Sequence, residues 1–78
     1  MPVDSVVLDV RPFHERGEEP FDAIMGAVEG LGPGQSLLLV NSFEPKPLFR
    51  VLGARGFEYR CSEVAPGEWH VLFTPRQP

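Results

Sequence analysis

Four polar residues have types and positions that could bind a small anion. Arg11 follows the first short apolar segment, Asn41 ends the second, and Lys46 opens an expected helix. A guanidinium is a planar fork that suits a carboxylate or phosphate, and a lysine adds positive charge to a helix end that already favours anions. His14, in the segment after Arg11, is the fourth candidate, as a residue that could close over the ligand.

Each of these residues also has a structural interpretation. Asp9 and Arg11 are two positions apart, so both can point to the same side and form an ion pair or anchor a loop. His14 would then be a solvated loop residue. Three carboxylates would oppose a bound anion: Glu18, Glu19 and Glu44. Both interpretations stay open at the level of sequence.

Cys61 is the other candidate for chemistry, and a single cysteine excludes an internal disulfide. We expect it within a strand beside apolar residues, where a buried structural thiol is the main interpretation and a reactive thiol the alternative. Neither His14 nor His70 has metal-ligand spacing with the other or with Cys61, so we expect no metal and no cofactor. The sequence contains no Ser-His-Asp or Cys-His pattern and no glycine-rich phosphate loop.

The composition indicates one small folded domain. The chain has 78 residues, an apolar fraction of 42% and a formal net charge of −4, so we expect a single domain over residues 1–78. The acidic balance argues against nucleic-acid binding, which requires a basic face. No apolar run approaches the ~20 residues that span a bilayer. No leader sequence opens the chain, so we expect a cytoplasmic protein that does not bind membranes.

In the first half of the chain, the spacing of apolar residues predicts a strand, a loop and a helix. We expect the strand over residues 6–10, a polar loop over 11–17 with a proline and a glycine as breakers, and a helix opening at Glu18-Glu19-Pro20. The helix carries one apolar stripe, formed by Phe21, Ile24, Met25, Val28 and Leu31. We interpret this stripe as core rather than as a cofactor site.

A second strand and a second helix follow. Residues 36–41 contain a continuous apolar run, typical of a strand near the middle of a sheet. Two prolines in residues 44–47 predict a helix start, because a first turn does not need their missing N–H groups. Gly56 is placed to end that helix in a left-handed conformation.

The last part of the chain predicts an antiparallel hairpin. Apolar residues alternate with polar ones over 57–64 and again over 69–73, and Cys61 lies on the expected core face. Residues 65–68 fit a type II turn, with proline and glycine at its centre. Residues 74–78 contain two prolines and little to bury, so we expect a loose tail.

Together these elements predict an α+β (α/β) two-layer sandwich of order β-α-β-α-β-β. Right-handed crossovers place both helices on one face of a four-stranded mixed sheet. The open face should carry an apolar patch of Val7, Leu72 and one of two pairs, Leu37/Leu39 or Leu38/Val40, with His70 beside Glu58 or Arg60. Since exposed apolar patches usually mark contacts, we expect a partner protein or a second copy to dock there.

Several residues, taken with this order of elements, resemble a known family. The run from Leu8-Asp9 through Glu19-Pro20 and Pro33-Gly34 to residues 37–40 resembles the TusA-like (SirA-like) sulfur-carrier superfamily. The resemblance implies the same fold and a sulfur-carrying cysteine in a Cys-Pro-x-Pro motif at the start of the first helix. Here Gly17 stands in the place of that cysteine, so no thiolate can form there.

The chain is more similar to an uncharacterised branch of that superfamily, often found beside or fused to hemerythrin-like or cupin domains. The similarity lies in Leu8-Asp9-Val10-Arg11, Pro33-Gly34, Leu39-Val40-Asn41, Pro45-Lys46-Pro47-Leu48 and Trp69-x-Val71. Members often have histidines before the first-helix proline and between the asparagine and the Pro-x-Pro. This chain has Glu19 and Ser42-Phe43-Glu44 there, so no role of those histidines carries over.

The sequence therefore favours a non-catalytic binding or regulatory module that acts through a small ligand or a partner protein. The partner could be a hemerythrin-like or cupin-like domain, with the chain as an interaction-only subunit. The alternative is a sulfur-relay protein that uses Cys61 as its persulfide carrier. Burial of Cys61 would separate these two hypotheses.

Overall fold

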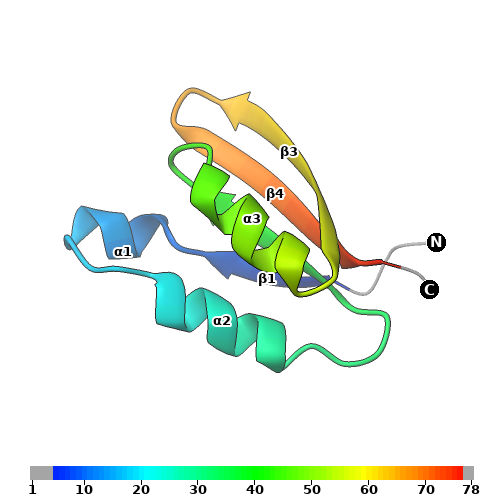
Figure 1. Cartoon of the computed structure of the whole chain (residues 1–78). Coiled ribbons are helices and arrows are strands. Elements are labelled where there is room, and N and C mark those ends of the chain that lie inside the picture. The colour runs from blue at the N-terminus through cyan, green and yellow to red at the C-terminus, as the bar shows by residue number, and fades with distance from the viewer. Residues whose placement is uncertain (1–4, 77–78) are drawn as a thin grey trace.

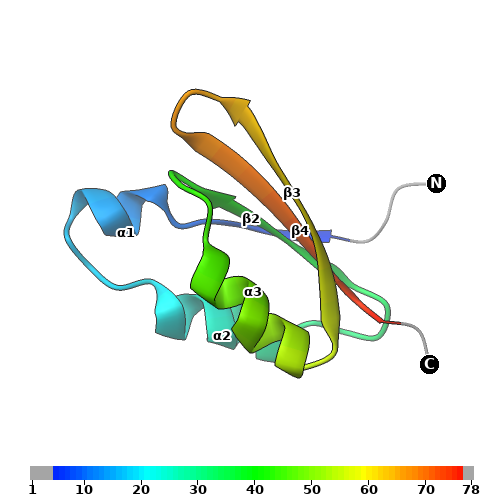
Figure 2. The same cartoon turned by 45° about the horizontal axis from the view of Figure 1, so that its top comes forward.

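A computed structural model describes residues 5–76 of the chain. Within this range the elements are β1 (Ser5–Asp9), α1 (Arg11–Glu15), α2 (Phe21–Glu29), β2 (Ser36–Asn41), α3 (Lys46–Ala54), β3 (Phe57–Ala65) and β4 (Glu68–Pro75) (Figure 1). The sheet has the strand order β1-β2-β4-β3, and β1 and β2 are parallel while the other pairs are antiparallel. Helices α2 and α3 lie on the same face of this sheet (Figure 2). The predicted mixed, four-stranded α+β sheet is confirmed.

The loop predicted over residues 11–17 is wrong, because α1 lies there. Pro12 is in the first turn of α1, where its missing N–H group breaks no helical hydrogen bond. Gly17 has a φ of 71° directly after the helix, and the Glu18 N–H donates to the Phe13 carbonyl at 2.8 Å, as in a Schellman ending. The two residues that suggested a loop are thus the start and stop signals of a third helix.

Helix α2 carries the predicted apolar stripe, but not all of it is core. Ile24, Met25 and Val28 are buried, whereas Phe21 is 43% exposed. The helix begins at Phe21 and Pro20 is its N-cap, rather than its first helical residue as expected. The exposed Phe21 ring therefore lies at the N-terminal end of α2, which is the end nearer to α1 in the sequence.

The two central strands supply four of the most deeply buried side chains of the core. These are Leu37, Leu39, Val71 and Phe73, each at most 1% exposed. The register pairs Leu37 with Phe73 and Leu39 with Val71, so all four point toward the helices. Leu38 and Val40 consequently face the other side of the sheet, which decides between the two pairs that the sequence left open.

The hairpin forms as predicted and continues further. Gly67 has a φ of 74° in the turn, and Gly56 has a φ of 91° after α3. Thr74 belongs to β4 opposite Glu58, although the sequence predicted a tail from residue 74. The Arg76 N–H also donates to the Gly56 carbonyl at 2.8 Å, and residues 77–78 of the expected tail lie outside the described residues.

The sheet face opposite α2 and α3 has a short apolar row. Pairing across the strands aligns Val7, Leu38 and Leu72 with Arg60, and Val7 is 62% exposed. His70 lies in the next row, opposite Ser62 rather than beside Glu58 or Arg60 as expected. The predicted patch forms only in part: Val7 is exposed, Leu38 and Leu72 are half-buried, and Val40 faces this side but is buried at 7% exposure.

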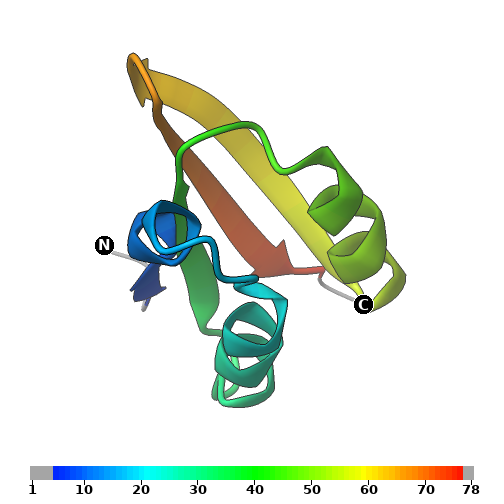
Figure 3. The ribbon, with the colours of Figure 1, turned by 90° about the vertical axis from the view of Figure 1, so that its left-hand side faces the viewer.

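Helices α2 and α3 lie above opposite edges of the sheet. Helix α2 packs against β1 and α3 against β3, which are the two edge strands. Seen from the end of the molecule, the two helices are set apart from each other (Figure 3). Side chains from β2 and β4 complete the core between the two helices. At one end, the space between the helices is not filled.

Candidate functional site

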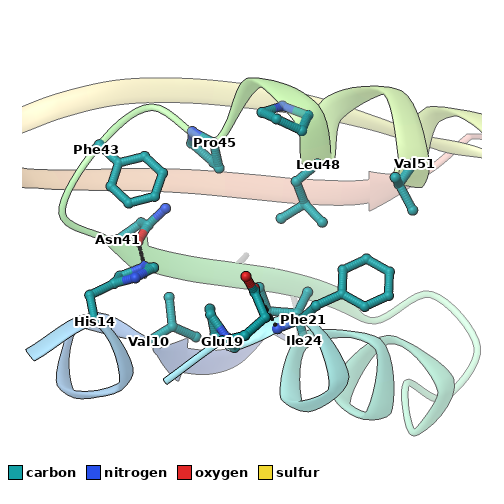
Figure 4. A pocket seen from close by; sticks show the side chains of 12 residues that line it. Val10, His14, Glu19, Phe21, Ile24, Asn41, Phe43, Pro45, Leu48 and Val51 are labelled. Atoms are coloured by element: carbon teal, nitrogen blue, oxygen red, sulfur yellow. Dashed lines mark hydrogen bonds between the residues drawn. The ribbon is translucent and has the colours of Figure 1, made fainter. Parts of the chain in front are cut away.

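A cleft of about 570 Å³ lies at that unfilled end, between α2, α3 and the end of β2 (Figure 4). Its walls are Val10, His14, Glu19, Pro20, Phe21, Ile24, Asn41, Phe43, Pro45, Pro47, Leu48 and Val51. Nine of these twelve residues are apolar, and the three polar ones are His14, Glu19 and Asn41. The volume is in the range of roughly 300–1,000 Å³ that is typical of sites for small organic ligands.

The parallel strands β1 and β2 place the polar end of the cleft. Both strands end at the same edge of the sheet, where Val10 follows β1 and Asn41 closes β2. The Val10 N–H donates to the Val40 carbonyl at 2.9 Å, which continues the pairing and fixes the start of α1. The short helix then carries His14 back over the end of β2.

His14 and Asn41 are in direct contact. His14 Nε2 lies 2.8 Å from Asn41 Oδ1, and the Ser42 backbone N–H donates to the same oxygen at 3.0 Å. Because a backbone N–H can only donate, the shared atom is the amide oxygen, and His14 Nε2 must carry a proton and donate as well. The ring of His14 also rests against the Phe43 ring, with centroids 4.9 Å apart.

Asn41 presents its amide nitrogen to the cleft. The residue is 3% exposed, and both hydrogen bonds that its side chain makes to described residues use Oδ1. The Nδ2 atom points away from His14, toward the Pro45 side of the cleft (Figure 4). No described residue accepts a hydrogen bond from Nδ2, and since no buried side-chain nitrogen or oxygen among residues 5–76 lacks a partner, Nδ2 is open to solvent.

Glu19 is the acidic residue of the cleft wall and lies at its rim. The residue is exposed, and Oε1 accepts a hydrogen bond from the Phe21 N–H at 3.1 Å. This contact satisfies one of the free backbone donors at the start of α2 and favours a carboxylate there. The rim consequently carries negative rather than positive charge.

Arg11 lies outside the cleft wall and is held by two carboxylates. Its Nη2 is 2.7 Å from Asp9 Oδ2, and its Nη1 is 3.5 Å from Glu68 Oε1. The hydrogen bonds from Arg11 hold the pKa of Asp9 below its usual range, and Asp9 in turn raises the pKa of Arg11. The structural interpretation of this pair, an ion pair at the end of β1, describes the observed contacts.

Lys46 also lies outside the cleft wall. Its side chain is 78% exposed, and its Nζ is 3.9 Å from Glu44 Oε1. The four residues considered for an anion site therefore separate in space: His14 and Asn41 meet at the cleft, while Arg11 and Lys46 are each near an acid elsewhere.

The sequence did not reveal the apolar walls of the cleft. Phe21 belongs to a stripe predicted as core, yet it is 43% exposed and borders the cleft, as does Phe43 at 50%. Three prolines frame the starts of α2 and α3, namely Pro20, Pro45 and Pro47. The signal available in the sequence was a phenylalanine close to the prolines of each helix start, Phe21 after Pro20 and Phe43 before Pro45.

Cys61 is on the helix side of β3 and away from the cleft. It packs against the edge of the core and is partly buried. This burial, with a smaller contribution from the charge of Glu44, raises the pKa of the Cys61 thiol. The thiolate that sulfur chemistry requires is thus disfavoured.

Residues 5–76 contain neither a cluster of metal ligands nor a membrane-spanning helix. Within this range, no three His, Cys, Asp or Glu side chains are grouped as metal ligands would be. None of the helices there has the length and apolar character needed to cross a membrane.

The fold and the cleft define a small two-layer α+β domain with a ligand-sized site between its helices. The chain belongs to the family described as uncharacterized conserved protein (DUF2249), whose model matches residues 7–75. Neither a curated protein nor a solved structure matches the chain.

Proposed function

We propose that this protein is a non-catalytic binding module that takes a small organic ligand in the cleft between α2 and α3. The cleft itself is the observation that carries the proposal. It is concave, has the size of a small-ligand site, and joins an apolar wall to a polar end formed by His14 and Asn41. This combination is typical of sites that bind small molecules.

The cleft wall supports binding rather than catalysis. Its twelve residues include no Ser, Thr, Cys, Tyr or Lys that could act as a nucleophile. The two side chains of the wall that could take part in proton transfer are already held in hydrogen bonds: His14 Nε2 donates to Asn41, and Glu19 accepts from the Phe21 N–H. A bound molecule would therefore be held without being attacked.

A wider relationship to the TusA-like sulfur carriers is part of this proposal. The element order supports it, once the short α1 is set aside. Sulfur relay through Cys61 is the weaker alternative, because this thiol is partly buried and its pKa is raised. Gly17, in the place of the carrier cysteine, ends α1 with a positive φ that suits glycine.

A fragment screen followed by two-dimensional ¹H–¹⁵N NMR tests the proposal. Bound fragments should shift the amide signals of residues around the cleft, and Val51→Trp, which fills the cleft from α3, should abolish these shifts. Val7→Trp adds the same ring to the opposite sheet face and should leave them intact. Fragment shifts that persist in Val51→Trp, or that cluster on the opposite face, would contradict the proposal.

A second candidate function concerns the open face of the sheet, which we propose as the contact with a second copy of the chain. The row of Val7, Leu38 and Leu72 supports it, because these apolar side chains lie side by side on this face and Val7 is 62% exposed. Arg60 lies at one end of the row, and Asp9 lies next to its other end. A patch that carries both signs of charge can match itself across a twofold axis, as a symmetric dimer requires.

A further inference from the structure

The unpartnered amide of Asn41 indicates which chemical class of ligand the cleft takes. Its Oδ1 already accepts two hydrogen bonds, from Ser42 N–H and from His14 Nε2. Its Nδ2 holds two hydrogens that no described residue accepts, and this atom is open to solvent although the residue as a whole is only 3% exposed. A ligand that fills the cleft displaces water from this donor. A ligand without an acceptor would then leave the donor buried and unpaired, at a cost in free energy, whereas an acceptor atom replaces the lost hydrogen bond.

The other polar groups make this donor selective. Swinging the Asn41 amide round would place its NH₂ group against the Ser42 N–H and the His14 N–H, so this orientation is locked. The side chain can therefore offer donors to the cleft but not its acceptor. A ligand group that meets it must contribute a lone pair, as a carbonyl oxygen does.

The charges around the cleft argue against an anionic ligand. Arg11 is occupied by Asp9 and Glu68, and Lys46 projects into solvent. The carboxylate in the cleft wall is that of Glu19, whose negative charge would repel an anion. A carboxylate or phosphate would thus lose its hydration without gaining a cation in return.

The remaining wall selects an apolar body. Ile24, Leu48 and Val51 face the cleft from α2 and α3, and the half-exposed rings of Phe21 and Phe43 lie at its two ends (Figure 4). Covering these surfaces with a ligand removes apolar area from water, which is the main favourable contribution to binding in such a site.

We propose that the ligand is an uncharged, largely apolar molecule with a carbonyl-type oxygen, seated so that this oxygen accepts a hydrogen bond from Asn41 Nδ2. The inference rests on the proposed function, because it specifies the ligand of the same cleft. The hydrogen bond to Asn41 sets the orientation of the ligand in the cleft, and the apolar side chains of the helices provide the contact area for its apolar body.

Three probes of similar size test the inference on ¹⁵N-labelled protein: acetophenone, which has the carbonyl, ethylbenzene, which lacks an acceptor, and benzoate, which is anionic. Acetophenone should bind about three- to tenfold more tightly than ethylbenzene, the factor that corresponds to one neutral hydrogen bond. It should also shift the Asn41 side-chain NH₂ signals directly. Benzoate should bind more weakly than acetophenone.

Two variants give the matched controls. Asn41→Asp keeps an oxygen for the Ser42 and His14 donors but replaces the NH₂ donor with a negatively charged acceptor oxygen, so the preference for acetophenone over ethylbenzene should be lost. Val51→Ala trims the apolar wall and should weaken both probes by the same factor, leaving their ratio unchanged. If Asn41→Asp does not fold, the comparison of the three probes on the unaltered protein still decides the question.

The outcomes separate this inference from the proposed function. Equal binding of acetophenone and ethylbenzene in the cleft, with unshifted Asn41 side-chain signals, would overturn the inference and leave the binding module standing. Tighter binding of benzoate would also overturn it, in favour of an anion. If none of the three probes binds in the cleft, the proposed function itself would be overturned.

Discussion

His14 Nε2 donates a hydrogen bond to Asn41 Oδ1 at 2.8 Å, and this contact joins α1 to the end of β2 across 27 residues of sequence. The bond closes one end of the cleft and, together with Ser42, sets the direction in which the Asn41 amide points. Helix α1, with five residues and no buried side chain, depends on such contacts for its position.

The first prediction concerns the tautomer of His14. Because Asn41 Oδ1 is an acceptor, the neutral imidazole should carry its proton on Nε2, and long-range ¹H–¹⁵N spectra should show this directly. His14→Ala should lower the free energy of unfolding by about 1 kcal/mol, the usual contribution of one hydrogen bond. A neutral ring protonated on Nδ1 would contradict the orientation assigned to Asn41.

The Asp9–Arg11 pair predicts a dependence of stability on pH. Since the pKa of Asp9 is lowered in the folded protein, its contribution is complete above the unfolded pKa of about 3.9 and is lost as the pH falls through the folded value. Asp9→Asn should therefore lower Tm slightly at pH 7, and the difference from the unaltered protein should vanish in strong acid. Both side chains are more than one-third exposed, so the effect is small.

Glu58→Gln is the control for that measurement, because it removes an exposed carboxylate of β3 that lies opposite Thr74, whereas Arg11 contacts Glu68 at the other end of β4. Its Tm difference should not follow the same pH profile. Loss of cooperative unfolding in Arg11→Ala would give the pair a larger structural role, whereas lost binding of small anions with an unchanged Tm would restore Arg11 as a ligand residue.

Replacing glycine by alanine should have opposite effects on stability at two positions, Gly56 and Gly26. Gly56 has a φ of 91° after α3, so Gly56→Ala should destabilise the fold by about 1 kcal/mol, because a left-handed backbone is strained for alanine. Gly26 lies within α2 and has open space where a Cβ atom would be. Gly26→Ala should therefore stabilise the fold by about 1 kcal/mol, through its better helix propensity. Urea unfolding of both variants measures the contrast.

The position of Cys61 predicts slow reaction with thiol reagents. Partial burial and a raised pKa should make iodoacetamide labelling of the folded protein much slower than labelling in urea. A variant with Cys61→Ser and Ser62→Cys moves the thiol to the adjacent exposed position and should react rapidly. Fast labelling of Cys61 would support the sulfur-relay alternative. So would the gain of one sulfur atom in the intact mass after incubation with a cysteine desulfurase and cysteine.

The open sheet face predicts self-association at high concentration. Light scattering should give a mass approaching that of a dimer, and Val7→Glu should return it to that of a monomer. Val64→Glu changes a valine of similar exposure, at 52%, on the other edge strand and should not affect association. A monomeric mass at every accessible concentration would remove this candidate function.

Much of the fold was predictable because its signals are local. The stripe from Ile24 to Val28 repeats with the helical period, and the residues of β4 alternate with the period of a strand. Gly56 and Gly67 have the positive φ values that their positions predicted. Helix α1 was missed because Pro12 and Gly17 are helix breakers in general but are permitted at the first turn and just after the last.

The candidate site was only half predictable from the sequence. Asn41 and His14 were placed at the end of the parallel strands by sequence order alone, since strand direction determines which ends meet. That Arg11 turns toward Glu68 was not predictable, because it depends on β4 lying beside β2 in the sheet. Asp9 could be predicted as a partner because it is two residues from Arg11, but nothing near Arg11 in the sequence indicates that Glu68 will also be close to it.

By itself, then, the sequence determined the four strands, helices α2 and α3 and the edge of the sheet where a site could lie, because these follow from side-chain period and backbone geometry. Only the tertiary structure decided that α2 and α3 lie above opposite edge strands, which opens the cleft, and that the Asn41 amide is locked with its donors facing it. Such features depend on contacts between side chains that are distant in sequence. The local pattern of residue types does not specify which of these contacts form.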